Sequence, residues 1–357
     1  MSQEKPTLRW GIIGTGLISS WFSRDISLAR DNAQAIHHIQ AIGSSSVEKG
    51  TKFVESHLQN QKQHPTVYGS YEEVYRDPKV DIVYLGIPHA FHKQACLEAI
   101  SYGKHVLCEK AFTLNAREAR EVFDAAKQKG VFVMEAMWTR FFPLVKTLKQ
   151  LVHNEKVVGD VVRVFCDFAM NQNLDSLGPE SRLKNPALGA GSLLDIGIYS
   201  LTWGLLTLDS EIGDQAQKPK VLATQTLKDG VDVGTSILLT YPSGKQGILT
   251  SNNVSVKTPA QFCRIEGTSG HIVVQGFVAS VPASFTVFTE QLPEGKQYEF
   301  ERPGRGFYWE ADSVALDITA GKTESDVMPW AETVRVMEML DEIRSQGGAR
   351  FPQDQES

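Results

Sequence analysis

The stretch GIIGTGLISSWF, which begins at Gly11, places two glycines between an apolar, strand-like run and a helix-like run. Gly14 and Gly16 fit the first two positions of a G-x-G-x-x-G pattern, and the third position holds Ser19. In a strand-turn-helix unit such glycines let the backbone approach a pyrophosphate, and the first amides of the helix donate to it. An imperfect pattern of this kind is weak alone, so the surrounding sequence decides its meaning.

The surrounding sequence alternates short runs rich in Val and Ile with amphipathic, helical runs from Thr7 to about Met134. We expect strands at residues 8–14, 35–43, 80–87, 104–109 and 131–136. The helical runs between them include residues 48–59, 91–103 and 115–130. This alternation predicts βαβ units and an α/β, doubly wound parallel sheet of the Rossmann type. Gly14 and Gly16 then follow the first strand, and Leu17 and Ile18 begin the first helix, where a dinucleotide would bind.

The second half of the chain has a different texture. Helical patterns at residues 141–154 and 191–206 precede a β-rich tract, and two more helices at 308–321 and 330–348 close the chain. The expected strands of the tract are residues 219–229, 231–241, 246–256, 261–267, 270–278 and 284–290. Strands that follow one another with short turns indicate an antiparallel sheet. We therefore predict a Rossmann domain over residues 1–138 and an α+β domain with an open, mainly antiparallel sheet over residues 139–357.

Composition narrows the partners of the chain. Its 357 residues suffice for two domains, and its formal charge of -6 offers no basic excess for nucleic acid or an anionic membrane. The apolar stretch from Ser192 contains an acid and several hydroxyls and is shorter than the roughly 20 apolar residues of a membrane span, so we expect a buried helix. No nucleic-acid or membrane partner is expected.

The cysteines and termini favour a cytoplasmic protein. The four cysteines are too widely spaced for a C-x-x-C pair or a disulfide framework, which suits a reducing compartment. They are Cys96, Cys108, Cys166 and Cys263. The polar N-terminus lacks the apolar core of a signal peptide.

The end of the second expected strand, AIGSSSVEKG, bears on the choice of cofactor. An acid at this position would accept hydrogen bonds from the ribose 2′-hydroxyl of NAD, but Ser44, Ser45 and Ser46 stand there and Lys49 follows. Hydroxyls and an ammonium group can donate to a 2′-phosphate, so NADP is favoured over NAD. The alternative is that this is an ordinary serine-rich loop with a solvated lysine.

Three further segments, CEKAF, EAMWTRFFP and GAGSLLDIGIYSL, make a family resemblance specific. Together with the glycine turn and the tail GFYWEADSVALDITAGKTES, the chain resembles the Gfo/Idh/MocA oxidoreductases over nearly its whole length. Within that family it is most similar to the branch of dimeric dihydrodiol dehydrogenases and NADP-dependent D-xylose dehydrogenases. The resemblance implies a homodimer formed through the C-terminal sheet.

The resemblance assigns a site after the expected strand at 104–109. The Glu-Lys-Pro signature of the family corresponds to Glu109, Lys110 and Ala111, so the usual proline is replaced. It implies that Glu109 and Lys110 lie beside the cofactor and that Lys110 assists catalysis. Lys110 should project from the carboxyl edge of the sheet, where ligands of such folds bind. The alternative is an ordinary surface lysine.

Asp195 and Tyr199 are four residues apart on an expected helix and therefore share one face. The resemblance implies that this pair lies in the substrate site, with Tyr199 as general base and Asp195 bonded to the substrate. A tyrosine serves as a base when a nearby cation lowers its pKa, and Lys110 could supply that charge. The alternative for Tyr199 is a core aromatic with a polar tip.

Other residues have weaker assignments. Trp138 and Phe168 match aromatic positions of the family's pocket, although either could be plain core, and Arg140 could bind substrate. His89 and His92 have a spacing that could hold a metal, but no convincing third ligand accompanies them. We therefore expect no metal and interpret the two histidines as cofactor-side or capping residues.

Taken with the resemblance, these residues imply an NADP-dependent oxidoreductase acting on CH–OH groups. Oxidation of D-xylose or a similar aldose at its anomeric carbon comes first, because the candidate groups combine hydrogen-bonding side chains with aromatic walls. A trans-dihydrodiol substrate needs the same base and hydride acceptor. A regulatory protein that binds NADP without turnover, and a tightly bound cofactor that cycles between two sugars, also remain open.

Overall fold

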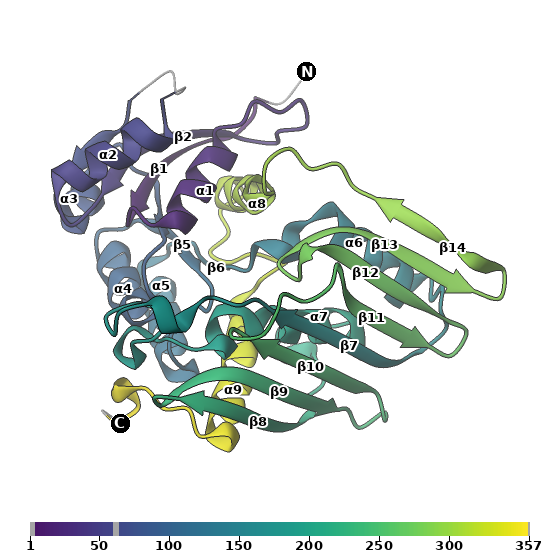
Figure 1. Ribbon diagram of the computed structural model, residues 1–357. Coiled ribbons are helices and arrows are strands. Elements are labelled where there is room, and N and C mark those ends of the chain that lie inside the picture. Colours follow the sequence, from purple (N-terminus) through teal and green to yellow (C-terminus); the bar gives the residue numbers. More distant parts are fainter. Residues whose placement is uncertain (1–3, 60–63, 356–357) are drawn as a thin grey trace. The chain divides into compact units, whose positions relative to one another are not determined.

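The computed structural model describes residues 4–59 and 64–355 (Figure 1). The chain divides into two compact units, each considered by itself below. The first comprises Met1–Thr113, Arg117–Phe141 and Arg302–Thr333. The second comprises Leu114–Ala116, Phe142–Glu301 and Val334–Ser357. The segment Arg302–Thr333, which the sequence division at residue 138 assigns to the C-terminal domain, thus packs with the N-terminal unit.

A six-stranded parallel sheet forms the centre of the first unit, in the order β3-β2-β1-β4-β5-β6. Its strands are β1 (Thr7–Ile13), β2 (Ile36–Gly43), β3 (Thr66–Tyr68), β4 (Ile82–Leu85), β5 (His105–Glu109) and β6 (Val133–Ala136). This order is that of a doubly wound Rossmann sheet and confirms the predicted fold class. Strand β3 has only three residues and no alternating pattern, and it was not expected from the sequence.

Helices accompany each strand of this sheet, because strands that are buried on both faces need cover on both sides. They are α1 (Leu17–Ile26), α2 (Val47–His57), α3 (Tyr71–Arg76), α4 (His92–Ser101), α5 (Ala116–Lys129) and α8 (Phe307–Thr319). Every residue of β4 is buried. Phe22 of α1 stacks on Tyr84 of β4 with ring centroids 3.9 Å apart, which fixes the first helix to the sheet beside the glycine turn.

The second unit contains an eight-stranded sheet in the order β14-β13-β12-β11-β7-β10-β9-β8. Its strands are β7 (Val161–Ala169), β8 (Lys220–Lys228), β9 (Val231–Thr240), β10 (Gln246–Asn252), β11 (Gln261–Gly267), β12 (Gly270–Val278), β13 (Val281–Thr289) and β14 (Leu292–Glu299). Among the described strands of this sheet, only β7 and β10 pair in parallel, so the predicted mainly antiparallel sheet is confirmed. Strand β7 was not expected, yet it lies between β11 and β10.

One face of this sheet packs against α7 (Ile198–Leu208), which is buried at every position. The helices α6 (Pro143–Lys149) and α9 (Trp330–Gly347) complete the regular helices of the chain's second half. The segment Pro186–Leu208 is long and apolar enough to cross a membrane, but 94% of its most apolar window is buried inside the protein. That burial is the behaviour of a core helix and agrees with the expectation for this stretch.

Asp25 explains how the segment Arg302–Thr333 is held in the first unit. Its buried carboxylate accepts hydrogen bonds from the backbone amides of Arg305, Gly306 and Phe307, at 2.9, 2.6 and 3.1 Å from Oδ2. Gly306, with a φ of +105°, is the N-cap residue of α8 and carries no side chain to cap the helix itself. Asp25 therefore supplies the missing cap from 280 residues away.

We expect Asp25→Ala to lower the free energy of unfolding by about 2–4 kcal/mol, because three amides, two of them buried, lose a charged acceptor. Chemical denaturation followed by circular dichroism measures this. Asp31→Ala is the control. Asp31 is exposed and lies between α1 and β2, and its replacement should change the free energy of unfolding by less than about 0.5 kcal/mol. Equal stability of Asp25→Ala and the wild type would show that the cap is not needed.

Candidate functional site

The glycine turn lies where the sequence predicts it, between β1 and α1. The Gly14 amide donates to Gly43 O at 3.0 Å, and Gly14 has a φ of +89°. A Cβ there would lie 2.7 Å from Ile87 Cγ2 and 2.9 Å from Gly86 O, so only glycine fits. Gly16 is the N-cap residue of α1 and has no side chain that could cap the helix. The first amides of α1, those of Leu17 and Ile18 among them, have no partner within the helix and can donate to a ligand.

The departure at the third position of the motif is compensated within the structure. Ser19 is buried, and its Oγ lies 3.4 Å from Gly86 O, to which it donates. A Cβ on Gly86 would lie only 2.2 Å from that Oγ. Gly86, at the end of β4, therefore provides the space that a glycine in the motif would otherwise provide. The turn keeps its close approach between α1 and β4.

The serine-rich tip follows β2, as expected. Ser44 is buried and its Oγ lies 3.4 Å from Thr15 Oγ1 of the glycine turn, whereas Ser45 and Lys49 are exposed. Lys49 Nζ donates to Ser45 Oγ at 3.1 Å, and Ser46 caps α2 through its contact with the Lys49 amide. A hydroxyl and an ammonium group thus lie together beside the glycine turn. This cluster, Ser44, Ser45 and Lys49, is called the serine tip below.

Lys110 lies directly after β5, in a loop that two histidines hold. His92 is completely buried, with Nδ1 3.0 Å from Ala111 O and 3.1 Å from Phe112 O, and Nε2 2.8 Å from Ile87 O. His89 Nε2 lies 3.3 Å from Lys110 O. Burial lowers the pKa of His92. Both ring nitrogens of His92 therefore face carbonyl oxygens, and we find it to be a residue that positions the Lys110 loop.

The same loop contains alanine at the position of the usual proline. The peptide bond between Lys110 and Ala111 is cis, although residue 111 is alanine. Glu109, the other retained member of the signature, accepts the Tyr84 hydroxyl at 2.5 Å through Oε1 and lies 3.2 Å from the Lys110 amide through Oε2. Glu109 is buried. These contacts place the backbone of Lys110 at the carboxyl edge of the parallel sheet.

Trp138 and Arg140 lie in a short turn, η2 (Trp138–Phe141), after β6. Trp138 stacks on Phe307 with ring centroids 4.1 Å apart and an interplanar angle of 7°. Arg140 Nη2 lies 2.5 Å from Glu332 Oε1, and both side chains are almost fully buried. The guanidinium thus has a buried structural partner. Substrate binding by Arg140 stays a prediction, and we do not carry it into the proposed site.

A second acid, Glu135, lies near Arg140. Burial raises the pKa of Glu135 to about 7, and the Arg140 guanidinium opposes that rise. Glu135 Oε1 accepts the Phe112 amide at 3.2 Å. Through Glu135, the segment EAMWTR holds the start of the connection between β5 and α5, and its last residues form the start of the turn η2.

In the second unit, Asp195 and Tyr199 lie on one helical segment, as expected, but its first part is a π-helical turn, η6 (Leu193–Gly197), that leads into α7. Such turns often occur at functional sites. Tyr199 is buried, and its ring lies 5.8 Å from that of Phe168, at an angle of 50°. The structure therefore brings Phe168, Asp195 and Tyr199 into one part of the second unit.

Two residues that the sequence analysis did not identify hold the Asp195 carboxylate. Gln172 Nε2 donates to Oδ2 at 2.9 Å, and Arg182 Nη1 donates to Oδ1 at 3.2 Å. The Arg182 side chain is 54% exposed, whereas that of Asp195 is 13% exposed. The cluster of Asp195, Gln172 and Arg182 thus combines acceptors and donors at the edge of a buried site. No spacing in the sequence signals these partners, because both lie in the irregular segment after β7.

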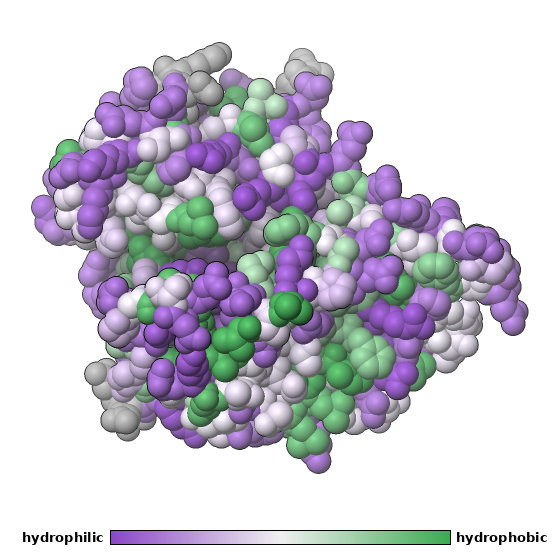
Figure 2. Space-filling view, in the orientation of Figure 1, coloured by the Kyte–Doolittle hydropathy of each residue, from purple (hydrophilic) through white to green (hydrophobic). Residues whose placement is uncertain are grey.

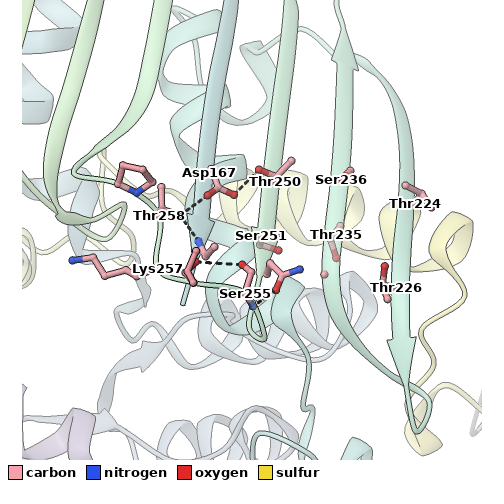
Figure 3. A pocket seen from close by; sticks show the side chains of 15 residues that line it. Asp167, Thr224, Thr226, Thr235, Ser236, Thr250, Ser251, Ser255, Lys257 and Thr258 are labelled. Carbon is pink, nitrogen blue, oxygen red and sulfur yellow. Dashed lines mark hydrogen bonds between the residues drawn. The ribbon is translucent and has the colours of Figure 1, made fainter. Parts of the chain in front are cut away.

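A separate pocket of about 360 Å³ lies on the outward face of the second unit's sheet (Figure 3). It is lined mainly by hydroxyl side chains, and Asp167 accepts the Thr250 hydroxyl at 2.6 Å and also that of Thr258. None of the predicted site residues lines this pocket. Within residues 4–59 and 64–355, no group of three or more potential metal ligands lies together, and the absence of a metal stays a prediction.

The first unit fits a dinucleotide on its own geometry. Gly14 leaves space that a Cβ would fill, the N-cap residue of α1 is a glycine without a capping side chain, and the serine tip adds donors next to the turn. A helix N-terminus attracts a phosphate through its amides and dipole. These residues would hold the pyrophosphate and the adenosine ribose.

Comparison with known proteins agrees with this geometry. Residues 8–137 match the family model described as "Oxidoreductase family, NAD-binding Rossmann fold", and residues 145–273 match the GFO/IDH/MocA C-terminal domain. The first unit is thus an NAD(P)-binding Rossmann fold.

Curated relatives cover nearly the whole chain. The chain is 34% identical to a D-xylose 1-dehydrogenase (NADP(+)) of Hypocrea jecorina, over 97% of this chain and 94% of the relative. It is also 34% identical to a trans-1,2-dihydrobenzene-1,2-diol dehydrogenase of Bos taurus, over 97% of this chain and 99% of the relative. A crystal structure of a 3-ketoreductase from Actinomadura kijaniata with NADP and TDP-benzene has the same fold, with a TM-score of 0.79 at 20% identity over 96% of this chain and 98% of that chain.

Proposed function

The chain belongs to the GFO/IDH/MocA family of oxidoreductases, and from that premise we propose that it is an NADP-dependent dehydrogenase that oxidises the anomeric carbon of D-xylose or a similar aldose to the lactone. The observation that carries this proposal is that Gln172 and Arg182 hold Asp195, which lies on the same helical segment as Tyr199. This cluster offers donors and an acceptor to a substrate with several hydroxyl groups. Its one exposed cation is balanced by one carboxylate, which suits a neutral substrate.

In the proposed reaction, Tyr199 accepts the proton of the anomeric hydroxyl, and Lys110 assists that proton transfer. Asp195, held by Gln172 and Arg182, accepts a hydrogen bond from a second substrate hydroxyl. Phe168 packs against the ring of Tyr199 and restricts its orientation. A bound nicotinamide ring supplies the hydride acceptor. His89 and His92 hold the loop of Lys110, so the lysine begins from a fixed backbone.

A trans-dihydrodiol is the second candidate substrate, because a relative of equal identity is a dihydrodiol dehydrogenase. Its reaction needs the same base, but a six-carbon arene diol has only two hydroxyls to pair with the Asp195 cluster. An NADP-binding protein without turnover is a further alternative. A third alternative is an enzyme that keeps its nicotinamide cofactor bound while it oxidises one sugar and reduces another. In that case the cofactor would copurify with the protein.

Reduction of NADP by the purified protein tests the proposal, with D-xylose, D-glucose, other aldoses, inositol and a trans-dihydrobenzenediol as substrates. We expect selective turnover of D-xylose, and Tyr199→Phe should lower kcat by about 10²–10⁴-fold, the usual contribution of a general base. Tyr75→Phe is the matched control. Tyr75 is also a buried tyrosine, and its own hydroxyl has no hydrogen-bond partner among the described residues. NADP binding without turnover of any substrate would contradict the dehydrogenase.

The serine tip supports NADP as the cofactor. We expect Lys49→Glu to raise the Kd for NADP by roughly 10–100-fold and to change the Kd for NAD much less, because a charge-assisted hydrogen bond to the 2′-phosphate is lost. Titration by protein fluorescence measures both constants. Lys52→Glu, one turn along α2 at an exposed position, is the control. A preference of the wild type for NAD would contradict this assignment.

We further propose a homodimer through the outward face of the second unit's sheet. Leu249 and Ser251 of β10 face the helices, so Ile248 and Thr250 point outward. The strand register aligns Ile248 with Leu238, Leu222 and Phe165 in one apolar row across four strands. Figure 2 shows hydrophobic side chains gathered over these strands. A half-exposed apolar row of this kind suits the same patch of a second copy.

Leu238→Arg should shift the protein from dimer to monomer in sedimentation velocity at micromolar concentration, because the charge would be buried opposite its own copy. Leu316→Arg, at an exposed apolar position of α8 in the first unit, is the control. A monomeric wild type would contradict the dimer but not the enzyme.

We also propose a cytoplasmic location, for which the four cysteines, all free and buried, are the support.

A further inference from the structure

A buried carboxylate lies beneath the start of the helical segment that carries Asp195 and Tyr199. Asp232, on β9, is 1% exposed. Its Oδ2 accepts the backbone amide of Leu193 at 2.7 Å and the Thr235 hydroxyl at 3.3 Å. Leu193 is the first residue of the π-helical turn η6. The carboxylate therefore caps this turn from a neighbouring strand.

The chain that enters the turn is shaped around the same carboxylate. Gly191 has a φ of +144°, and a Cβ at this position would lie 2.1 Å from Asp232 Oδ1. The backbone of Gly191 thus occupies space next to the carboxylate that no other residue could share. Gly191 O in turn accepts the amide of Asp195 at 3.2 Å. One acidic side chain is packed against both the entrance to the turn and its first amide.

This contact determines where the turn begins. Asp195 follows Leu193 by two residues, and Tyr199 follows Asp195 by four, so a shift at Leu193 moves both side chains. A negative charge at the N-terminus of a helical segment also interacts favourably with its dipole. Ser192 adds a second anchor, because its Oγ donates to Ser251 Oγ at 2.9 Å.

The charge of Asp232 is a cost to the fold. Burial raises its pKa to about 7, while the Leu193 amide, the Thr235 hydroxyl and Arg344 of α9 act in the opposite direction. Since this pKa lies above the usual value of 3.8, the native state binds the proton more strongly than the unfolded state does. Stability from this group is therefore complete below about pH 4, declines as the pH rises towards 7, and stays reduced above it. An uncharged side chain of the same shape would avoid that cost.

We propose that Asp232 is a positioning residue for the dehydrogenase: its carboxylate holds the turn Leu193–Gly197 in the orientation in which Asp195 meets Gln172 and Arg182. This inference rests on the proposed function, and it adds a residue that does not touch the substrate. It explains why a buried acid stands where a neutral residue would favour stability. The same contact requires glycine at position 191.

Asp232→Asn tests the proposal, because it removes the charge and keeps the shape. At pH 8, where the wild-type carboxylate is mostly charged, we expect kcat/KM for the aldose to fall by about 5–20-fold, the difference between a charged and a neutral acceptor. The Kd for NADP should stay within twofold, since the turn lies in the second unit. The melting temperature at pH 8 should be equal to or higher than that of the wild type. A loss of activity without a loss of stability separates positioning from a structural role.

Thr235→Val is the matched control. It removes a neutral donor to the same carboxylate and leaves both the charge and the Leu193 contact in place, so kcat/KM should change by less than about threefold. Gly191→Ala keeps the charge but pushes the carboxylate away from the turn, and it should lower kcat/KM at least as much as Asp232→Asn.

Hydrogen exchange provides a readout that does not depend on turnover. The amides of residues 193–199 should exchange about 5–20-fold faster in Asp232→Asn, and those of α1 should not change. Unchanged exchange together with wild-type kcat/KM in Asp232→Asn would overturn the inference and leave the enzyme intact. A wild type without turnover would overturn the proposed function, and the exchange rates would still decide whether Asp232 holds the turn.

Discussion

The parallel register of the first sheet is the constraint on which the rest of the first unit depends. Parallel strands end at the same edge, so the residues that follow β1, β2, β4 and β5 come together without any contact between their sequences. Ile13 pairs with both Gly43 and Leu85, which brings the glycine turn, the serine tip and Gly86 to one edge. Leu85 pairs with Cys108, and Lys110 follows two residues later.

Because this edge is a product of topology, the sequence could predict most of it. The alternation of apolar and amphipathic runs indicated the parallel sheet, and Gly14, the serine tip and Lys110 each follow an expected strand. The compensation of Ser19 by Gly86 could not be predicted, since it depends on an approach between residues 67 positions apart. The cap that Asp25 provides for α8 could not be predicted either, because in the sequence Asp25 is an ordinary acid within a helix.

The second unit was harder to predict, for a related physical reason. Strand β7 carries charged residues, Arg163 and Asp167, on its outward side, and its neighbours in the sheet come from much later in the chain. Arg163 pairs with Glu266 of β11, so a charge that suggests a loop in the sequence is satisfied across the sheet. Arg140 shows the reverse case. Its position within a family motif suggested that it binds substrate, but in the structure its guanidinium forms a buried ion pair with Glu332, 192 residues away.

In the proposed function, recognition of the substrate depends on whether each hydrogen-bonding group of the Asp195 cluster finds a substrate hydroxyl. A site that holds its polar groups for hydrogen bonding rejects an analogue without the matching hydroxyl strongly, because the desolvated groups then stay unpaired. A hydrophobic pocket has no such penalty and distinguishes weakly. Gln172 and Arg182 pair with Asp195, so a substrate must replace or extend those bonds to gain affinity. The ring of an aldose carries hydroxyl groups on several carbons, whereas an arene diol carries only two. In the function proposed above, the cluster therefore favours the aldose, and the fixed turn beneath Asp195 adds a geometric reason to the chemical one.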